Sequence, residues 1–308
     1  MTAQGSDQVL RFEQSRLDLF AVHGFQGQGR RITGRSGRET YAMVRGDGEC
    51  PTVLLHGGVG VGAEWALLAG RLEGPIVIVD RPGYGLSYPM DYRKVDFRRD
   101  ASDWLVDLVD GLGVEKVNVI GASMGGLFAM AFATAHPQRV QLLGLVGAPA
   151  GLHRGMSVFL RLYANPIIGR LISRIRMDAT MLRDRAFSSY LTHPDRLPMD
   201  LLEVAAAGGV LPGTALTART TLNAIANFRG QRPELMMLED MARLEVPTRF
   251  VWGDHDSVLS FAYGEDLVGR MRDARLTLIE DAGHMPQLDQ PGAVAAALNS
   301  YIHTAVPI

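Results

Sequence analysis

Short apolar runs, separated by longer amphipathic segments, constrain the fold of this 308-residue chain more than any other feature. The runs are almost continuously apolar and rich in Val, Ile and Leu, as strands buried on both faces of a parallel sheet must be. The segments between them, such as residues 97–111 and 124–135, place apolar side chains at helical spacing. The pattern predicts an α/β fold, with a mostly parallel sheet flanked by helices. The predicted strands are Thr52–Leu55, Ile76–Val79, Val117–Ile120, Leu142–Val146, Thr248–Trp252 and Leu276–Ile279.

The pattern is less regular before the first of these runs. Residues 8–22 predict a short helix, and residues 24–38 are rich in Gly and Arg and predict turns. Residues 39–44 predict one further strand. The regular alternation of strands and helices is therefore expected only after this point.

One long interval lacks strand-like runs. Between Ala148 and about Pro233 the sequence predicts helices, interrupted by the glycine-rich stretch 208–213. The predicted organisation is a core of residues 1–150 and 234–308 with a helical insertion, residues 151–233. Counted through Glu234, the insertion carries eleven arginines against six acids, whereas the whole chain has a net charge of −2. We expect most of these arginines to be solvated and a minority to face an anionic substrate.

Composition excludes several classes of function. A net charge of −2 gives no basic field to attract nucleic acid, and the single cysteine, Cys50, excludes an intramolecular disulfide and a cysteine-based metal cluster. We expect no nucleic-acid partner, no metal and no cofactor. The first residues lack the features of a secretion signal, and no stretch of eighteen residues is continuously apolar. We therefore expect a cytoplasmic protein without a membrane partner, and the sequence does not indicate its oligomeric state.

The segment Gly121-Ala122-Ser123-Met124-Gly125-Gly126 lies between a predicted strand and a predicted helix. A Gly-x-Ser-x-Gly sequence at such a junction forces a tight turn that projects the serine side chain above the sheet. The backbone N–H of Met124, at the start of the helix, is expected to point where an oxyanion develops. The segment predicts a nucleophilic serine, Ser123, with an oxyanion donor beside it.

A serine hydroxyl needs a base to take its proton and an acid to orient that base. Among the eight histidines, His284 has the best context, because it lies in a short loop after the last predicted strand. The segment Trp252-Gly253-Asp254-His255-Asp256 follows the preceding strand and offers two carboxylates, between which spacing alone does not choose. The chain order serine, acid, histidine is that of one fold that carries a Ser-Asp-His triad.

Five motifs follow one another along the chain. They are His56-Gly57-Gly58, Asp80-Arg81-Pro82-Gly83-Tyr84-Gly85-Leu86-Ser87, the segment around Ser123, Gly253-x-x-Asp256 and Gly283-His284-x-Pro286. Together they resemble the motifs of the alpha/beta-hydrolase fold superfamily, and the resemblance runs from about Arg30 to Tyr301. It implies that the acid is Asp256, at the fourth position of Gly-x-x-Asp, and that residues 151–233 form a helical cap, or lid, over the hydrolase core.

The glycine-rich loop after His56 fits two interpretations. Gly58-x-Gly60-x-x-Ala63 matches a dinucleotide-binding turn, with Asp80 about twenty residues later as a ribose ligand. The hydrolase resemblance implies instead that the N–H of Gly58 or Val59 is the second oxyanion donor and that His56 is structural. We favour the hydrolase interpretation, because dinucleotide binding leaves the predicted triad without a role.

The resemblance implies acyl transfer to water through an acyl-enzyme, without a cofactor. Serine at position 123 argues against the dehalogenase and epoxide hydrolase branches, which have Asp there. The elbow and the basic cap resemble carbon–carbon bond hydrolases that cleave dienoates, but those enzymes usually have Asn and Trp where this chain has Ala122 and Met285. We therefore predict a carboxylic ester or lactone hydrolase, with the carbon–carbon bond hydrolase as the first alternative. Thioester, amide and perhydrolase chemistry, and a non-hydrolytic biosynthetic catalyst or small-molecule receptor on the same fold, stay open.

The apolar residues of the predicted cap suggest a small-molecule substrate with an apolar acyl part. We expect most of them to serve packing and a few to contact substrate. They are Phe159, Leu162, Tyr163, Ile167, Leu171, Leu182, Phe187, Tyr190, Leu211, Leu222 and Phe228.

Overall fold

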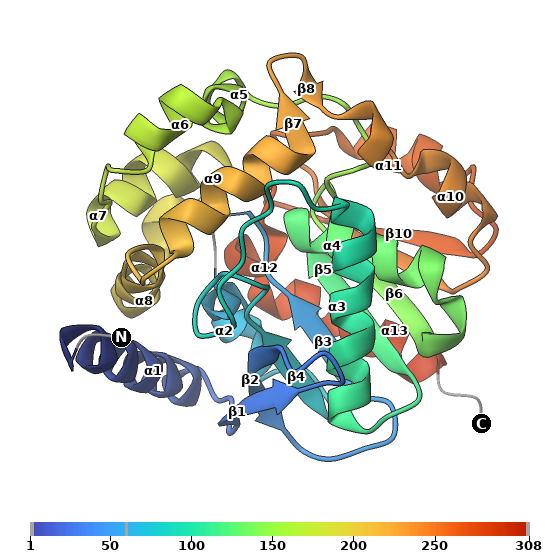
Figure 1. The fold of residues 1–308 in the computed structure, drawn as a ribbon. Helices are drawn as coiled ribbons and strands as arrows, with labels where there is room; N and C mark the ends of the chain where they lie inside the picture. The colour runs from blue at the N-terminus through green and yellow to red at the C-terminus, as the bar shows by residue number, and fades with distance from the viewer. Residues whose placement is uncertain (1–2, 59–60, 306–308) are drawn as a thin grey trace.

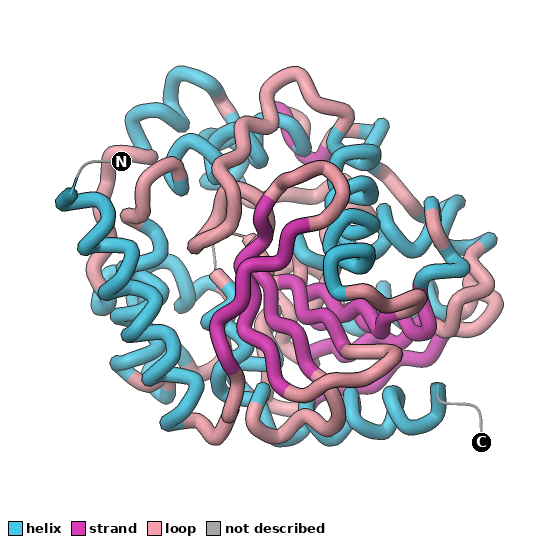
Figure 2. Tube along the Cα trace, turned by 60° about the horizontal axis from the view of Figure 1, so that its bottom comes forward, coloured by secondary structure: helices cyan, strands magenta, loops and turns pink. Residues whose placement is uncertain are grey.

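A single eight-stranded sheet runs through the middle of the molecule, with helices around it (Figure 2). The computed structural model describes residues 3–58 and 61–305. The strand order is β1-β2-β4-β3-β5-β6-β9-β10; β1 and β2 are antiparallel, and the strands from β4 to β10 in this order are parallel. The strands are β1 Gln28–Thr33, β2 Glu39–Arg45, β3 Thr52–Leu55, β4 Ile76–Val79, β5 Val117–Ala122, β6 Val140–Val146, β9 Thr248–Gly253 and β10 Ala274–Ile279.

Each face of the sheet packs against its own apolar core, since successive strand residues point to opposite faces. In β3, Val53 and Leu55 join the core that α3, α4, α10 and α11 cover, whereas Leu54 joins the core that α1, α2, α12 and α13 cover. The predicted fold class and the predicted parallel strands are confirmed. The covering helices are α1 Ala3–Val22, α2 Ala66–Ala69, α3 Phe97–Leu112, α4 Met124–Ala135, α10 Leu238–Arg243, α11 Phe261–Val268, α12 Pro286–Asp289 and α13 Pro291–Ala305.

Helix α3 illustrates how local sequence sets the element boundaries. The carboxylate of Asp96 accepts a hydrogen bond from the backbone N–H of Arg99, which caps the first turn. Gly113, with φ of 73°, follows the last turn in the left-handed conformation that glycine adopts without strain. The helix therefore ends beside the sheet, and the chain re-enters it as β5.

The interval 151–233 is mainly helical, and α5 to α9 gather on one side of the molecule (Figure 1). Between residues 179 and 189 the helical conformation is irregular: a single α-helical turn is followed by a π-helical turn at Leu182–Ala186 and a 3₁₀ turn at Phe187–Ser189. The expectation that the interval contains no strand is wrong, because a two-residue hairpin, β7 and β8, follows α9. The elements are α5 Val158–Ala164, α6 Pro166–Ile172, α7 Ala179–Met181, α8 Met199–Gly209, α9 Thr214–Ile225, β7 Ala226–Asn227 and β8 Gly230–Gln231.

The prediction of turns over residues 24–38 is also wrong in part. Residues 28–33 form the edge strand β1, which pairs with β2 along its whole length. Only Ile32 of β1 is buried, so the strand shows no alternation that the sequence could reveal. Arginines on an exposed edge strand are consistent with the way edges are protected from pairing with another chain.

Helix α1 is longer than predicted and contacts both the sheet region and α8 (Figure 1). Its Arg16 is fully buried and forms an ion pair with the buried Asp80, with 2.5 Å between Nη1 and Oδ2. The Arg16 guanidinium also lies over the ring of Tyr41, 4.3 Å from its centroid. Asp80 additionally accepts hydrogen bonds from the N–H groups of Gly62 and Leu86. The pair fixes α1 to the turn that follows β4.

Five of the apolar residues expected to pack inside the cap or to face substrate are exposed instead. Tyr163, Leu211 and Leu222 are buried as expected, and Leu182, Phe187 and Tyr190 are half-buried. A helical period shows which side chains share a face, but not whether another element covers that face. The exposed residues are Phe159, Leu162, Ile167, Leu171 and Phe228.

Among residues 3–58 and 61–305, no single helix is long and apolar enough to cross a membrane. Only the pair α8 and α9 passes the criteria of length and composition together, and the two helices are bent by 82° at the break between them.

Candidate active site

Ser123 lies in a strained turn between β5 and α4. Its φ of 47° and ψ of −108° fall in a region that a residue with a side chain rarely adopts. Two close approaches need glycine: a Cβ at Gly121 would collide with the backbone of Gly125, and a Cβ at Gly125 would collide with the carbonyl of Leu55. The backbone N–H of Ser123 donates to the carbonyl of Val146, which fixes the turn above the sheet.

His284 contacts the serine with its imidazole. Its Nε2 lies 2.9 Å from the Oγ of Ser123. The backbone N–H of His284 donates to the carbonyl of Tyr190 at 2.7 Å, and the two rings are 5.5 Å apart between centroids. A segment far away in sequence therefore helps to hold the histidine loop.

Asp256 is the carboxylate that contacts His284. Both carboxylate oxygens lie 3.0 Å from Nδ1 of His284, and the Asp256 side chain is completely buried. Burial alone would raise the pKa of Asp256, but hydrogen bonds from His284 and from the N–H groups of Val258 and Ala148 hold it below its usual value. Because an ionised carboxylate only accepts hydrogen bonds, Nδ1 carries a proton and Nε2 is left to accept one from Ser123.

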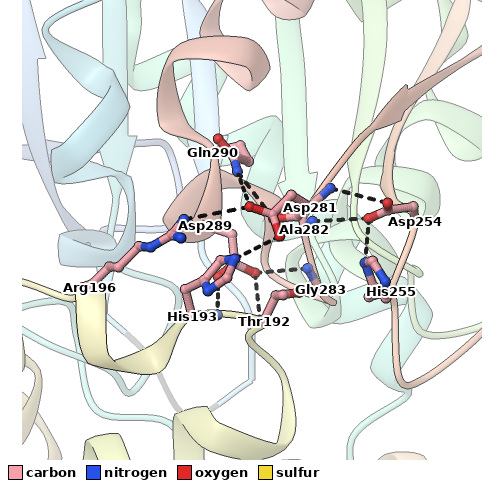
Figure 3. A network of polar contacts seen from close by, with 10 residues as sticks. All are labelled: Thr192, His193, Arg196, Asp254, His255, Asp281, Ala282, Gly283, Asp289 and Gln290. Carbon is pink, nitrogen blue, oxygen red and sulfur yellow. Dashed lines mark hydrogen bonds and ion pairs between the residues drawn. The ribbon is translucent and has the colours of Figure 1, made fainter.

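Asp254, the other carboxylate of this segment, contacts the loop that precedes His284 (Figure 3). It accepts hydrogen bonds from the backbone N–H groups of Asp281 and Ala282, and from Nδ1 of His255. The structure therefore brings Ser123, Asp256 and His284 together and leaves Asp254 outside this cluster.

A third carboxylate joins the loop of His284 to the segment after Tyr190. Asp289 accepts hydrogen bonds from the N–H groups of Thr192, His193 and Gly283 (Figure 3). His193 also contacts the carboxylate of Asp281, 2.7 Å away. Asp289 was not predicted from the sequence, since nothing in its local sequence marks a carboxylate that only backbone groups contact.

One predicted oxyanion donor, Met124, directly follows Ser123. The N–H of Met124 belongs to the first turn of α4, where helical N–H groups have no acceptor within the helix. On the other loop, the buried guanidinium of Arg81 donates to the carbonyls of Gly57 and Gly58. In a trans peptide the C=O and N–H point in opposite directions, so the N–H of Gly58 points away from Arg81. Val59, the alternative donor, lies outside the described residues.

His56 holds the base of this loop, as the sequence analysis expected. Its Nε2 accepts the backbone N–H of Arg81 at 3.0 Å, and its Nδ1 lies 3.0 Å from the carbonyl of Gly57. Burial and the charge of Arg81 lower the pKa of His56 well below its usual value. The ring is therefore neutral, with Nδ1 donating to Gly57.

The family match agrees with this geometry. The model of the alpha/beta hydrolase family matches residues 52–297. The chain belongs to the alpha/beta hydrolase family. The match includes all three residues of the Ser123–His284–Asp256 cluster.

Two relatives of this hydrolase cover most of the chain. An uncharacterized protein of Mycobacterium tuberculosis is 28% identical over 273 residues, which are 84% of this chain and 77% of that protein. The 2-hydroxy-6-oxononadienedioate/2-hydroxy-6-oxononatrienedioate hydrolase 2 of Pseudomonas putida is 27% identical, over 79% of this chain and 84% of its own length. The relatives and the family match identify the chain as a hydrolase.

Solved structures share the fold of this hydrolase. Naproxen esterase from Bacillus subtilis has a TM-score of 0.75 and 21% identity, and the match covers 98% of this chain and 99% of that one. A 2-hydroxy-6-oxo-6-phenylhexa-2,4-dienoate hydrolase from Rhodococcus has a TM-score of 0.72 and 21% identity, covering 90% and 99%. At this identity the likeness concerns the fold.

The described residues do not support the dinucleotide interpretation of the loop after His56. Asp80, the ribose ligand of the dinucleotide interpretation, is engaged by Arg16 and by two backbone N–H groups. The loop before it continues into a 3₁₀ turn, Gly62–Trp65, and a one-turn helix, α2, instead of the long helix of a dinucleotide fold. No group of three or more His, Cys, Asp or Glu residues in the described ranges could hold a metal ion.

Glu64 is a buried acid that the sequence analysis missed. Its Oε1 accepts the N–H of Gly57 at 2.8 Å, so it supports the loop that carries Gly58. Burial raises the pKa of Glu64 to about 7, although the N–H of Gly57 and the charge of Arg81 lower it. The sequence does contain an indication of its burial, because Glu64 is the only charged residue between Leu54 and Gly70.

We expect the Glu64→Gln variant to lose a pH dependence of stability. From about pH 4.5 to about 7, folded Glu64 keeps a proton that the unfolded chain releases, so the free energy of unfolding falls as pH rises. The shift corresponds to about 3 kcal/mol, fully lost above the folded pKa. Urea unfolding at pH 5 and pH 8 measures it, and Glu64→Gln should remove most of that difference. The surface control Glu239→Gln should keep the pH dependence of the wild type. If the free energy of unfolding changed equally between pH 5 and pH 8 in the wild type, in Glu64→Gln and in this control, the raised pKa of Glu64 would be contradicted.

Proposed function

We propose that this hydrolase cleaves a carboxylic ester or lactone through an acyl-enzyme on Ser123. The observation that carries the proposal is the continuous contact from Ser123 Oγ through His284 to the buried Asp256. We propose further that residues 151–233 act as a cap over the core of residues 1–150 and 234–308. The contact of Tyr190 with His284 supports a cap that reaches the site.

The chemistry follows from the donors and acceptors of the cluster. His284 Nε2 takes the proton of Ser123 as its Oγ bonds to the carbonyl carbon, and the N–H groups of Met124 and of Gly58 or Val59 stabilise the oxyanion. The C–O bond to the leaving group then breaks, and that oxygen takes the proton from His284. Water, deprotonated by His284, attacks the acyl-enzyme, and Ser123 leaves with the proton as the acid is released.

The second candidate is hydrolysis of a carbon–carbon bond in a dienoate. The names of relatives such as the Pseudomonas putida enzyme favour it. Against it stand Ala122 and Met285, where such enzymes usually have Asn and Trp. The half-buried ring of Tyr190, which contacts His284, is consistent with a small substrate that has an apolar acyl part. A cytoplasmic location and the absence of a nucleic-acid partner stay predictions from the sequence.

A substrate screen tests the proposed function. Purified protein is assayed with p-nitrophenyl esters of increasing acyl length, with lactones and with a dienoate, and is labelled with a serine-directed phosphonate. We expect turnover of at least one ester or lactone and a label on Ser123. Turnover of the dienoate with negligible ester hydrolysis would favour the second candidate. If the protein turned over none of these substrates and the phosphonate did not label it, the hydrolytic proposal would be rejected in favour of a receptor.

A further inference from the structure

Helices α5 and α6 and the β7–β8 hairpin lie at the outer edge of the molecule (Figure 1). Apolar side chains and arginines of these elements are exposed. The backbone joins these elements, because the carbonyl of Arg154, just before α5, accepts the N–H of Gln231 in β8. We call this group the rim patch. It consists of Arg154, Val158, Phe159, Leu162, Ile167, Arg170, Leu171, Arg174, Ile175, Arg176, Phe228 and Arg229.

The apolar part of the rim patch is ordered by helical spacing. Along α6 and the turn after it, Ile167, Leu171 and Ile175 recur every four residues and are 76%, 59% and 60% exposed. The opposite side of these helices is covered, since Tyr163 and Gly169 are buried. Phe228, at the tip of the hairpin, is 76% exposed. Large exposed apolar side chains gathered on neighbouring elements, here α5 with α6 and α5 with β7, mark an interaction surface.

The charge of the rim patch has one sign. Residues 154–177 contain five arginines and no acidic residue, although the whole chain has a net charge of −2. In the part of the chain that the structure describes, none of these five guanidinium groups pairs with a carboxylate. The partner of this surface must therefore offer apolar volume and negative charge together.

We propose that the rim patch docks this hydrolase on a membrane surface rich in anionic phospholipid. The apolar side chains would enter the boundary between headgroups and acyl chains, as those of interfacial helices do. The arginines would bind lipid phosphates, which the planar guanidinium contacts with paired hydrogen bonds. Docking of this kind is peripheral, and it departs from the expectation of no membrane partner that composition alone suggested.

Other occupants fit the patch less well. A second copy of the chain would bring arginines against arginines across a two-fold axis, which like-charge repulsion opposes. Nucleic acid would attract the arginines, but it would leave Ile167 and Phe228 without an apolar environment. The docking does not depend on the proposed ester hydrolysis, because no residue of the rim patch belongs to the Ser123 cluster.

Vesicle co-sedimentation of the full chain tests the inference. The probes are phosphatidylcholine vesicles with and without about 30% phosphatidylglycerol, at low ionic strength and at about 0.5 M salt. We expect the protein to sediment with the anionic vesicles, and high salt to weaken this binding. Equal binding to both vesicle types, or no binding to either, would overturn the proposal.

Two variants of the patch and two matched controls sharpen the test. The triple change Arg170→Gln, Arg174→Gln, Arg176→Gln should weaken partitioning about 100-fold, at about fivefold for each arginine. Its control is Arg243→Gln, Arg270→Gln, Arg272→Gln, which removes three exposed arginines elsewhere.

The apolar variant is Ile167→Glu with Phe228→Glu, and its control is Leu10→Glu with Val22→Glu on the exposed side of α1. We expect about 100-fold weaker partitioning for the patch variant only. Thermal melts and turnover of a short soluble ester should stay close to wild type for all four. A protein that sediments as a dimer and becomes monomeric in the patch variants, without vesicle binding, would assign the surface to a second copy and overturn the proposal.

Discussion

The Ser123→Ala variant is expected to fold normally and to lose about 10⁶-fold in kcat, because removal of a triad nucleophile leaves only binding and oxyanion stabilisation. In the structure, the Oγ of Ser123 is the atom within hydrogen-bond distance of His284 Nε2. Initial rates on the best ester from the substrate screen measure the loss. Phosphonate labelling of the same preparation should disappear.

The unusual backbone of Ser123 supplies an internal control. Glycine adopts a φ of 47° without strain, so Ser123→Gly should be as inactive as Ser123→Ala and should melt at a higher temperature. Lower stability of Ser123→Gly relative to Ser123→Ala would contradict the turn geometry. Activity close to wild type in either variant would reject Ser123 as the nucleophile.

The Asp256→Asn variant is expected to show the second large effect, a loss of about 10⁴-fold in kcat. An asparagine amide can donate to Nδ1 of His284, which favours the tautomer with the proton on Nε2. That nitrogen then cannot accept the proton of Ser123. Asparagine also has one oxygen for the N–H groups that both carboxylate oxygens now accept, from Ala148 and Val258. Steady-state kinetics on the same ester, with KM measured separately, checks the prediction.

Asp254→Asn is the matched comparison, since it makes the same chemical change two residues away. It weakens contacts to the N–H groups of Asp281 and Ala282, each worth about 1 kcal/mol. We therefore expect less than about a tenfold loss of kcat. A larger loss for Asp254→Asn than for Asp256→Asn would reverse the assignment of the acid.

The buried strands were predictable because burial on both faces forces a continuous apolar sequence. Val117–Ile120 and Ile76–Val79 stand out for this reason, and both lie within observed strands. Strand β1 was not predictable, since at an exposed edge only Ile32 had to be apolar. The two-residue hairpin of β7 and β8 is too short to produce any periodic signal.

The sequence was sufficient to locate the candidate site, but not to choose between the two candidate acids. Ser123 and His284 each follow a strand, and parallel strands end at the same edge of the sheet. The choice between Asp254 and Asp256 needed the direction of each side chain, which only the loop conformation determines. The sequence did not predict that Glu64 and Arg81 support the loop of Gly57 and Gly58, because burial of a charge depends on distant residues packed over it.

The boundary of the family match and the boundary of the folding unit differ in this chain. The match starts at residue 52, whereas Arg16, the buried partner of Asp80, lies on α1. A chain shortened to the matched residues would keep the buried carboxylate of Asp80 without its cation. An uncompensated buried charge costs about 3–5 kcal/mol, a large part of the total stability of a typical domain. Helix α1 is therefore part of the folding unit of the hydrolase, although it lies outside the segment that matches the family.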